Sequence, residues 1–263
     1  MLNYPEIDPV LLDLGVIKIR WYGLMYVIGF VIAWLLARKR ALATWSIIKP
    51  RQVDDLIFYC MLGVILGGRL GYVFFYGFDN LKADPLYIVK ITEGGMSFHG
   101  GLAGVMVAMW LFARRLGVRM WGVWDFVAPL APLGLFFGRV GNFINGELWG
   151  KPTDLPWGFR VGGEVLHPSM LYEAVLEGLV LFVVLWVYSA KERPFMSVSG
   201  LFLLLYGVFR FLVEFVRVPD AHLGYLAADW VTMGQILSMP MIVLGAAMLF
   251  LAYRNRRPEE ATV

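Results

Sequence analysis

The 263-residue sequence has few of the side chains from which many enzyme sites are built. It contains one cysteine and three histidines. Because Cys60 has no second cysteine to pair with, the chain can form neither an intrachain disulfide nor a thiolate metal cluster. The HExxH, GxSxG and P-loop motifs are absent, which removes the usual sequence support for a zinc protease, a serine hydrolase or a P-loop nucleotide-binding protein. The sequence also has no internal repeat and no low-complexity segment.

Charged residues are scarce as well. They make up 16% of the chain, against about 25% in an ordinary soluble domain, whereas hydrophobic residues make up 59% and the mean hydropathy is +0.68. Seven apolar runs are long enough, or nearly so, to cross about 30 Å of hydrocarbon. They are Trp21–Ala37, Leu56–Phe75, Met96–Phe112, Val123–Phe137, Pro168–Tyr188, Val198–Val216 and Thr232–Tyr253.

This pattern predicts an all-α integral membrane protein, a bundle of seven transmembrane helices that forms a single domain over residues 1–263. Two connections contain proline and are long enough to fold into small structures outside the membrane, Gly77–Gly95 and Lys151–His167.

Basic residues are unevenly distributed over the connections. One set, made of Arg38–Val53, Arg114–Trp121, Lys191–Ser197 and the tail after Tyr253, holds 13 Lys and Arg, and the other set holds 8 although it is longer in total. Because cytoplasmic connections are enriched in Lys and Arg, we expect the first set to be cytoplasmic. The N-terminus is then outside and the C-terminus is cytoplasmic. The net charge of +3 reflects this topology and indicates no nucleic-acid partner.

The segment Gly138–Gly150 is the most informative in the chain. It combines Arg139, Asn142, Asn145 and Glu147 with four glycines, directly after an apolar run. Polar groups in that position are costly unless they line a cavity or meet a charged ligand. The alternative is an interfacial loop whose arginine reaches up to lipid headgroups. Because amides, a carboxylate and glycines occur together, the segment favours a functional polar pocket.

Ionisable residues inside the other apolar runs usually face the bundle interior, pair with one another or mark a substrate path. Tyr206, Arg210 and Glu214 are spaced four apart and share one helix face, with Arg217 three residues further on. Arg69 lies in another run, and a further run contains Glu173 and Glu177. These charges either pair to hold the helices in register or form a site.

Three arginines and one histidine are predicted to lie in the outer half of the bilayer. Arg210 is six residues from the outer end of its run, or roughly 9 Å deep. Arg69 has a similar depth, Arg139 is at the outer end of its run, and His99 is near the outer end of another. Scattered structural ion pairs would not favour one leaflet, so three arginines there indicate an anion. Phosphate matches the planar fork of guanidinium donors.

His99 is flanked by glycine pairs at positions 94–95 and 100–101. A single histidine near an interface often serves only as a hydrogen-bonding anchor. Histidine also accepts a proton near neutral pH, and the glycines leave the ring accessible. Both the anchor and the general base remain open.

Several ordered segments together resemble the motifs of bacterial prolipoprotein diacylglyceryl transferases, over about Pro5 to Arg254. The central one is Gly138-Arg139-Val140-Gly141-Asn142-Phe143-Ile144-Asn145-Gly146-Glu147. The others are Arg20–Tyr26 (RWYGLMY), Gly94–Gly101 (GGMSFHGG), His167–Glu173 (HPSMLYE) and Phe209–Phe215 (FRFLVEF).

The resemblance implies a reaction and its partners. Members of the family move the diacylglyceryl group of phosphatidylglycerol to the thiol of a lipobox cysteine in a preprolipoprotein, forming a thioether and releasing glycerol phosphate. The expected location is the bacterial inner membrane, with the active site toward the outer leaflet. The substrate brings its own thiol, so the reaction requires no catalytic cysteine, no metal and no cofactor.

The residues fit this chemistry. Negative charge grows on the leaving phosphate, which fixed arginines stabilise selectively in the transition state. We assign Arg139 and Arg210 to that phosphate and Arg69 to a supporting or structural pair. The other members of the predicted phosphatidylglycerol site are Asn142, Asn145 and Glu147, which orient the glycerol hydroxyls or the arginines, Tyr22 and Tyr206, which donate to phosphate oxygens, and Glu214. His99 is the candidate for thiol deprotonation.

Two other classes compete with this interpretation. A transporter or channel for an anionic solute would use the same arginines, but it should show related halves or helices broken near the midplane. The sequence has no such internal similarity. A structural scaffold gives no reason for arginines to gather toward one face.

Overall fold

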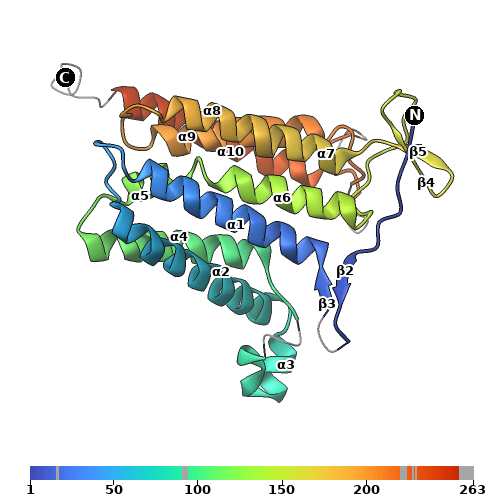
Figure 1. The fold of residues 1–263 in the computed structure, drawn as a ribbon, viewed down its shortest axis with the longest axis horizontal. Coiled ribbons are helices and arrows are strands. Elements are labelled where there is room, and N and C mark those ends of the chain that lie inside the picture. The colour runs from blue at the N-terminus through green and yellow to red at the C-terminus, as the bar shows by residue number, and fades with distance from the viewer. Residues whose placement is uncertain (16–17, 91–93, 220–223, 227, 229, 255–263) are drawn as a thin grey trace. The chain divides into compact units, whose positions relative to one another are not determined.

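The computed structural model describes residues 1–15, 18–90, 94–219, 224–226, 228 and 230–254, and the fold is mostly helical (Figure 1). The chain divides into two compact units. One consists of Met1–Leu36 with Val127–Val263 and the other of Ala37–Phe126. Each unit is described by itself.

Every predicted apolar run contains helix. The helices are α1 (Trp21–Arg40), α2 (Val53–Phe75), α4 (Phe98–Leu116), α5 (Met120–Val127), α6 (Ala131–Ile144), α7 (Ser169–Glu173), the π-helical η4 (Ala174–Val180), α8 (Leu181–Tyr188), α9 (Ser197–Val213) and α10 (Met233–Arg254). Within the described residues, five helical stretches are long and apolar enough to cross a membrane, namely Trp21–Arg40, Pro50–Phe75, Met120–Ile144, Ser169–Tyr188 and Met233–Arg254. The helices α4 and α9 are not among these five.

The predicted run Val123–Phe137 differs from the structure at both ends and in the middle. A turn at residues 128–130 separates α5 from α6, where Pro129 lacks a backbone N–H and disfavours helical geometry in the residue before it. Beyond Phe137, α6 continues to Ile144. Arg139 and Asn142 are therefore helical residues, and the prediction that the connection begins at Gly138 was wrong.

In the unit Ala37–Phe126, α2 and α4 lie side by side (Figure 1). Glycines bring the two backbones together. A Cβ atom on Gly63 would lie 2.6 Å from the carbonyl oxygen of Gly104, and one on Gly71 would lie 2.7 Å from the Cα of Gly100. Small residues at four-residue spacing allow this close approach, as they do in membrane helix pairs. The same unit also contains α3 (Phe78–Ala83) and the short 3₁₀ helices η1 (Pro50–Gln52) and η2 (Pro85–Val89).

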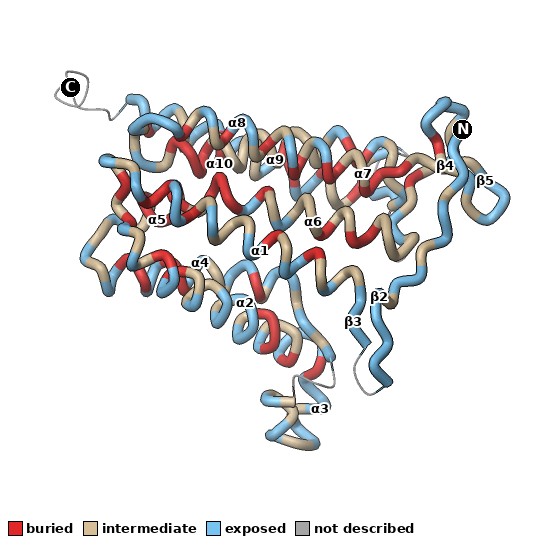
Figure 2. The backbone as a smooth tube through the Cα atoms, viewed as in Figure 1, coloured by how far each residue is buried: buried red, intermediate tan, exposed pale blue. Residues whose placement is uncertain are grey.

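In the other unit, α9 packs along α10 and α6 packs against η4. Figure 2 shows buried positions along α6, which contains the buried residues Pro132, Gly138, Gly141 and Asn142. Over its most apolar window, only 17% of α10 is buried. Because α10 leaves large apolar side chains such as Val243, Leu244 and Phe250 exposed, its outer face fits contact with lipid.

Short strands accompany the helices, which the all-α prediction did not include. A three-stranded sheet has the order β1 (Leu2–Asn3), β4 (Phe159–Val161), β5 (Glu164–Leu166). Its β4–β5 hairpin turns at Gly162 and Gly163, whose φ values of 59° and 92° suit glycine. A second hairpin pairs β2 (Val10–Asp13) with β3 (Lys18–Arg20). Small folded elements do occur in both predicted connections, as β4–β5 and as α3 with η2.

Candidate active site

A buried carboxylate, Glu173 at the end of α7, is surrounded by three arginines. Its side chain is 0% exposed. Arg139 from α6 and Arg217, just beyond α9, each form an ion pair with it, and Nη1 of Arg210 from α9 donates to Oε1 at 3.0 Å. The charges predicted from separate apolar runs are therefore brought together around one acidic side chain.

Glu214 is the second carboxylate of the cluster. Its Oε1 lies 2.5 Å from Nη2 of Arg210 and 3.2 Å from Nε of Arg217. The spacing of four and three residues along the chain places these partners on one face, as the sequence predicted. Thr232, from the start of α10, donates its hydroxyl to Oε2 of Glu214 at 2.6 Å.

The arginines keep donors that these carboxylates do not use. Within the described residues, Nη2 of Arg139, Nε of Arg210 and Nη2 of Arg217 make no hydrogen bond. The three side chains are 23%, 18% and 14% exposed, so they are accessible although their carboxylates are buried. The unused N–H donors of these accessible guanidinium groups suit an anionic ligand.

A third carboxylate, Glu177, has a different environment. It lies in η4, one turn after Glu173, and is 0% exposed. Among the described residues, neither of its oxygens has a hydrogen-bond partner. It lies within electrostatic reach of Arg210, Arg139 and Arg217. Glu177 lies in a π-helical turn, and such turns often occur at functional sites.

The polar residues that follow Arg139 form a continuous chain of hydrogen bonds. Nη1 of Arg139 donates to Oδ1 of Asn142 at 3.3 Å. The amides of Asn142 and Asn145 both donate to Oε1 of Glu147, at 2.9 and 3.1 Å. The predicted polar residues are thus brought together, and Glu147 orients both amides from the turn after α6.

Tyr22 of α1 approaches α6 at a glycine. A Cβ atom on Gly141 would lie 2.8 Å from Cδ2 of Tyr22, so a larger residue would displace the ring. The hydroxyl of Tyr22 is 3.1 Å from that of Tyr26. Tyr22 lies within electrostatic reach of Arg139 and Glu147. Tyr206 of α9 lies within the same reach of Arg210.

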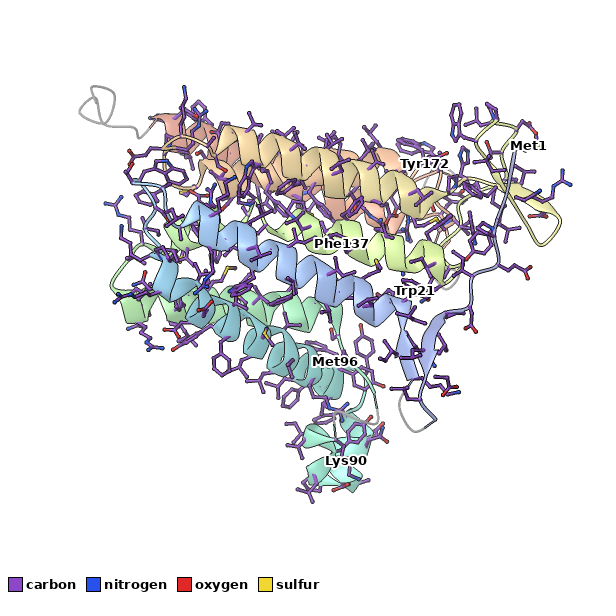
Figure 3. All side chains as sticks on the ribbon, in the orientation of Figure 1. Met1, Trp21, Lys90, Met96, Phe137 and Tyr172 are labelled. Carbon is purple, nitrogen blue, oxygen red and sulfur yellow. The ribbon has the colours of Figure 1, made fainter. Side chains whose placement is uncertain are left out.

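Contacts from segments outside the helices fix the end of α6 and the residues that follow α9. The hydroxyl of Tyr4 donates to the carbonyls of Phe143 and Ile144 at 2.9 and 3.0 Å, which satisfies acceptors that a helix end leaves open. Gly150 forms a β-bridge with Arg217, so the position of Arg217 depends on the segment after Glu147. Figure 3 shows the side chains in place, with Phe137 on α6 and Tyr172 on α7 labelled.

His167 lies just before α7, between Lys151 and Tyr172. Its Nδ1 is 3.1 Å from the hydroxyl of Tyr172. Burial lowers the pKa of His167 below its ordinary value, and the positive charge of Lys151 lowers it further. The neutral ring is therefore favoured in this connection.

The remaining predicted site residues, Arg69 and His99, belong to the unit Ala37–Phe126. Arg69 is 2% exposed. Nε donates to the carbonyl of Ile88 at 3.2 Å and Nη1 to that of Gly94 at 2.5 Å, with further bonds to Gly95 and Tyr87. These bonds favour the structural alternative for Arg69. His99 is exposed in the first turn of α4, after the N-cap Ser97.

Some members of the cluster were not predicted as site residues. Glu173 and Arg217 were visible as ionisable residues at helical spacing, but the sequence does not reveal that both contact the same partners. Thr232 was missed entirely. Its signal is the pattern Thr-x-x-Gln at Thr232–Gln235 immediately before an apolar run, which is a capping box.

The fold and this cluster define a class, a helical membrane protein with a buried arginine–carboxylate cluster. Comparison with known proteins identifies the family within that class. The family model described as prolipoprotein diacylglyceryl transferase matches residues 9–251, and the chain belongs to this family. The family predicted from the sequence motifs is confirmed.

The chain is similar to curated proteins over nearly their whole length. It is 58% identical to a phosphatidylglycerol–prolipoprotein diacylglyceryl transferase of Solidesulfovibrio magneticus, over 95% of this chain and 96% of the relative. Proteins of the same name from Methylococcus capsulatus and Pseudomonas aeruginosa are each 56% identical, over 97% of this chain and 99% and 97% of theirs.

Proposed function

We propose that the protein transfers the diacylglyceryl group of phosphatidylglycerol to the cysteine thiol of a lipobox in a preprolipoprotein. Membership of the family and the names of the full-length relatives support this assignment. The observation in the molecule that supports it best is the cluster of Arg139, Arg210 and Arg217, which retains N–H donors beyond those used by Glu173 and Glu214.

The reaction exchanges one bond at carbon for another. The thiolate sulfur forms a bond to the glyceryl carbon as the bond from that carbon to the phosphate oxygen breaks. The electron pair goes to the phosphate, which leaves as glycerol phosphate, and the thiol proton goes to a base. The demand on the protein is thus to stabilise a phosphate whose charge increases and to favour the thiolate, since a free thiol has a pKa of about 8.5.

Arg139 and Arg210 meet the first demand. Donors fixed before the reaction stabilise the developing charge without reorganisation. Glu173 fixes both arginines, because its buried carboxylate forms an ion pair with Nε of Arg139 and accepts a hydrogen bond from Nη1 of Arg210. A partly neutralised arginine cluster also holds the leaving phosphate less tightly than three free cations would, so product release remains possible.

The other site residues position substrate or supply proton transfer. Asn142, Asn145 and Glu147 orient the glycerol hydroxyls of the headgroup, while Tyr22 and Tyr206 donate to phosphate oxygens. Glu214 orients Arg210. Arg69 supports the fold of the unit Ala37–Phe126. His99 takes the proton of the thiol.

The protein functions as a multi-pass protein of the bacterial inner membrane. All seven apolar runs cross the bilayer, the N-terminus is outside and the C-terminus is cytoplasmic, with the active site toward the outer leaflet. The support is the excess of Lys and Arg in one set of connections and the presence of a helix at each run.

The test uses the purified protein, phosphatidylglycerol vesicles and a synthetic lipobox peptide. The expected result is a gain of one diacylglyceryl mass on the peptide with release of glycerol phosphate. A peptide with serine in place of the lipobox cysteine, and vesicles of phosphatidylethanolamine, are the controls. An unmodified cysteine peptide would refute the proposal. If the peptide stays unmodified and vesicles that contain the protein transport phosphate, the result would favour an anion transporter.

A further inference from the structure

Thr232 connects the start of α10 to the arginine cluster. Its hydroxyl oxygen accepts from the backbone N–H of Gln235 at 3.2 Å, and the same hydroxyl donates to Oε2 of Glu214 at 2.6 Å. The side chain of Gln235 accepts in return from the backbone N–H of Thr232 at 3.0 Å. The capping box is therefore complete. Because Thr232 and Glu214 are only 3% and 4% exposed, water does not compete strongly for this bond.

Glu214 has little freedom beside α10. A Cβ atom on Gly234 would lie 2.5 Å from both Cδ and Oε1 of Glu214, so only glycine leaves room for the carboxylate at the first turn of α10. The N-terminus of a helix also favours a negative charge. The other side of the same carboxylate holds Arg210 and Arg217.

The helix that presents Thr232 is closely packed on the helix that carries Arg210. Figure 1 shows α9 and α10 side by side. A Cβ atom on Gly207 would lie 2.9 Å from Cγ1 of Ile242, and one on Gly200 would lie 3.1 Å from the carbonyl oxygen of Gly245. This close packing restricts sliding, so the start of α10 is held against the end of α9 where Glu214 lies.

We propose that Thr232 is a positioning residue for the phosphate-binding arginine Arg210, acting through Glu214. The hydroxyl fixes one oxygen of Glu214, and the other oxygen then sets the direction of the Arg210 guanidinium. This inference rests on the proposed function. It assigns a role in catalysis to Thr232, a residue that otherwise would only cap a helix.

The principal variant is Thr232→Val, which keeps the shape of the side chain and removes the hydroxyl. We expect kcat for peptide modification to fall about 10- to 100-fold, the usual range for a lost supporting contact or a small misplacement. The KM for phosphatidylglycerol should change by less than about threefold, because the arginine still binds phosphate and only its alignment is lost. Thr232→Ser restores the hydroxyl and should restore kcat.

Two matched variants separate positioning from capping. Gln235→Met breaks the other half of the capping box and does not touch Glu214, so it should lower thermal stability with kcat within about twofold of wild type. Gly234→Ala keeps both capping bonds and raises helix propensity, but its methyl group displaces Glu214. It should lower kcat by more than Gln235→Met does, although the overpacked methyl group also lowers the unfolding temperature.

A double-mutant cycle tests the route through Glu214. In a Glu214→Ala background, Thr232→Val should cause no further loss, because the intermediate group is gone. Equal losses of kcat in Gln235→Met and Thr232→Val, or full kcat in Thr232→Val, would overturn the inference. If the wild-type protein itself leaves the peptide unmodified, the proposed function fails instead, so the two failures are distinguishable.

Discussion

Arg69 and Arg139 are both arginines of largely apolar helices, but the two units of the protein hold them differently. Arg69 is 2% exposed and, among the described residues, donates only to backbone carbonyls. Arg139 is 23% exposed and is held by the carboxylate of Glu173 and the amide of Asn142. Arg69 uses Nε and both terminal nitrogens for its hydrogen bonds. Arg139 makes no hydrogen bond from Nη2 to any described residue, so this donor is available to a ligand.

The difference separates an arginine that builds the fold from one that can meet a ligand. Carbonyls satisfy a buried guanidinium without neutralising it, so Arg69 stabilises the positions of Tyr87, Ile88 and Gly94, whose carbonyls it bonds. Carboxylates neutralise most of the charge of Arg139, Arg210 and Arg217 and fix their direction, which is the preorganisation that charge stabilisation in a transition state requires.

The largest expected effect lies in the unit of Arg69, at His99. If this residue is the general base, His99→Asn should lower turnover by about 10²- to 10⁴-fold. Raising the pH should partly rescue the variant, because more of the substrate is already thiolate. Full turnover of the variant across pH 6–8 would leave His99 as an anchor and would place the chemistry in the other unit alone.

Arg139→Lys and Arg210→Lys test the ligand-binding side of the comparison. Each keeps the charge and loses the planar pair of donors, so we expect kcat to fall about 10²- to 10³-fold, as when a donor to a developing oxyanion is removed. If saturating phosphatidylglycerol restores the rate, these arginines only bind lipid. Near wild-type turnover in either variant would remove that arginine from a geometry-dependent role.

Arg69→Met tests the structural side. The substitution leaves the carbonyls of Ile88, Tyr87 and Gly94 without their donor in a buried site, so the free energy of unfolding should fall by about 3 kcal/mol. Activity per folded molecule, measured at low temperature, should fall far less than in Arg139→Lys. A loss of kcat equal to that of Arg139→Lys at unchanged thermal stability would show that Arg69 contacts substrate.

The sequence predicts the helices better than their contacts. Long apolar runs indicate helices because few other structures satisfy the backbone in a membrane. The break at residues 128–130 depends on Pro129, whose effect a hydropathy run does not reveal. Residues of α6 such as Arg139 were assigned to a connection because glycine and asparagine favour turns, whereas packing against η4 keeps them helical.

The site was predictable in part for the same reason. The spacing of Arg210, Glu214 and Arg217 on one helix face indicates their proximity, and the structure confirms it. The contact between Glu173 and all three arginines joins three separate segments, and no spacing within one helix reveals it. The catalytic roles of these residues remain predictions until the variants are measured.

Gly67→Ala has a smaller expected effect, and it concerns the packing of α2 on α4. A Cβ atom there would lie 2.7 Å from the Cα of Gly104, so the two helices must separate, at a cost of about 1–3 kcal/mol. Gly134→Ala on α6 is the matched control, because among the described residues no atom outside its own helical turn lies within 4 Å of the added carbon. Equal unfolding temperatures for the two variants would show that the α2–α4 contact tolerates a methyl group.

The smallest expected effect on activity accompanies the test of topology. In a Cys60→Ala background, which removes the single native thiol, cysteines at Thr153 and Arg119 report on one connection from each unit. Because the connection with fewer basic residues should be outside, an impermeant thiol reagent on cells stripped of their outer membrane should label Thr153→Cys and not Arg119→Cys. Permeabilised cells provide the control for accessibility of both sites. Labelling of Arg119→Cys alone would reverse the orientation and place the arginine cluster toward the cytoplasmic leaflet, where a thiol acceptor arriving from the outer face could not reach it.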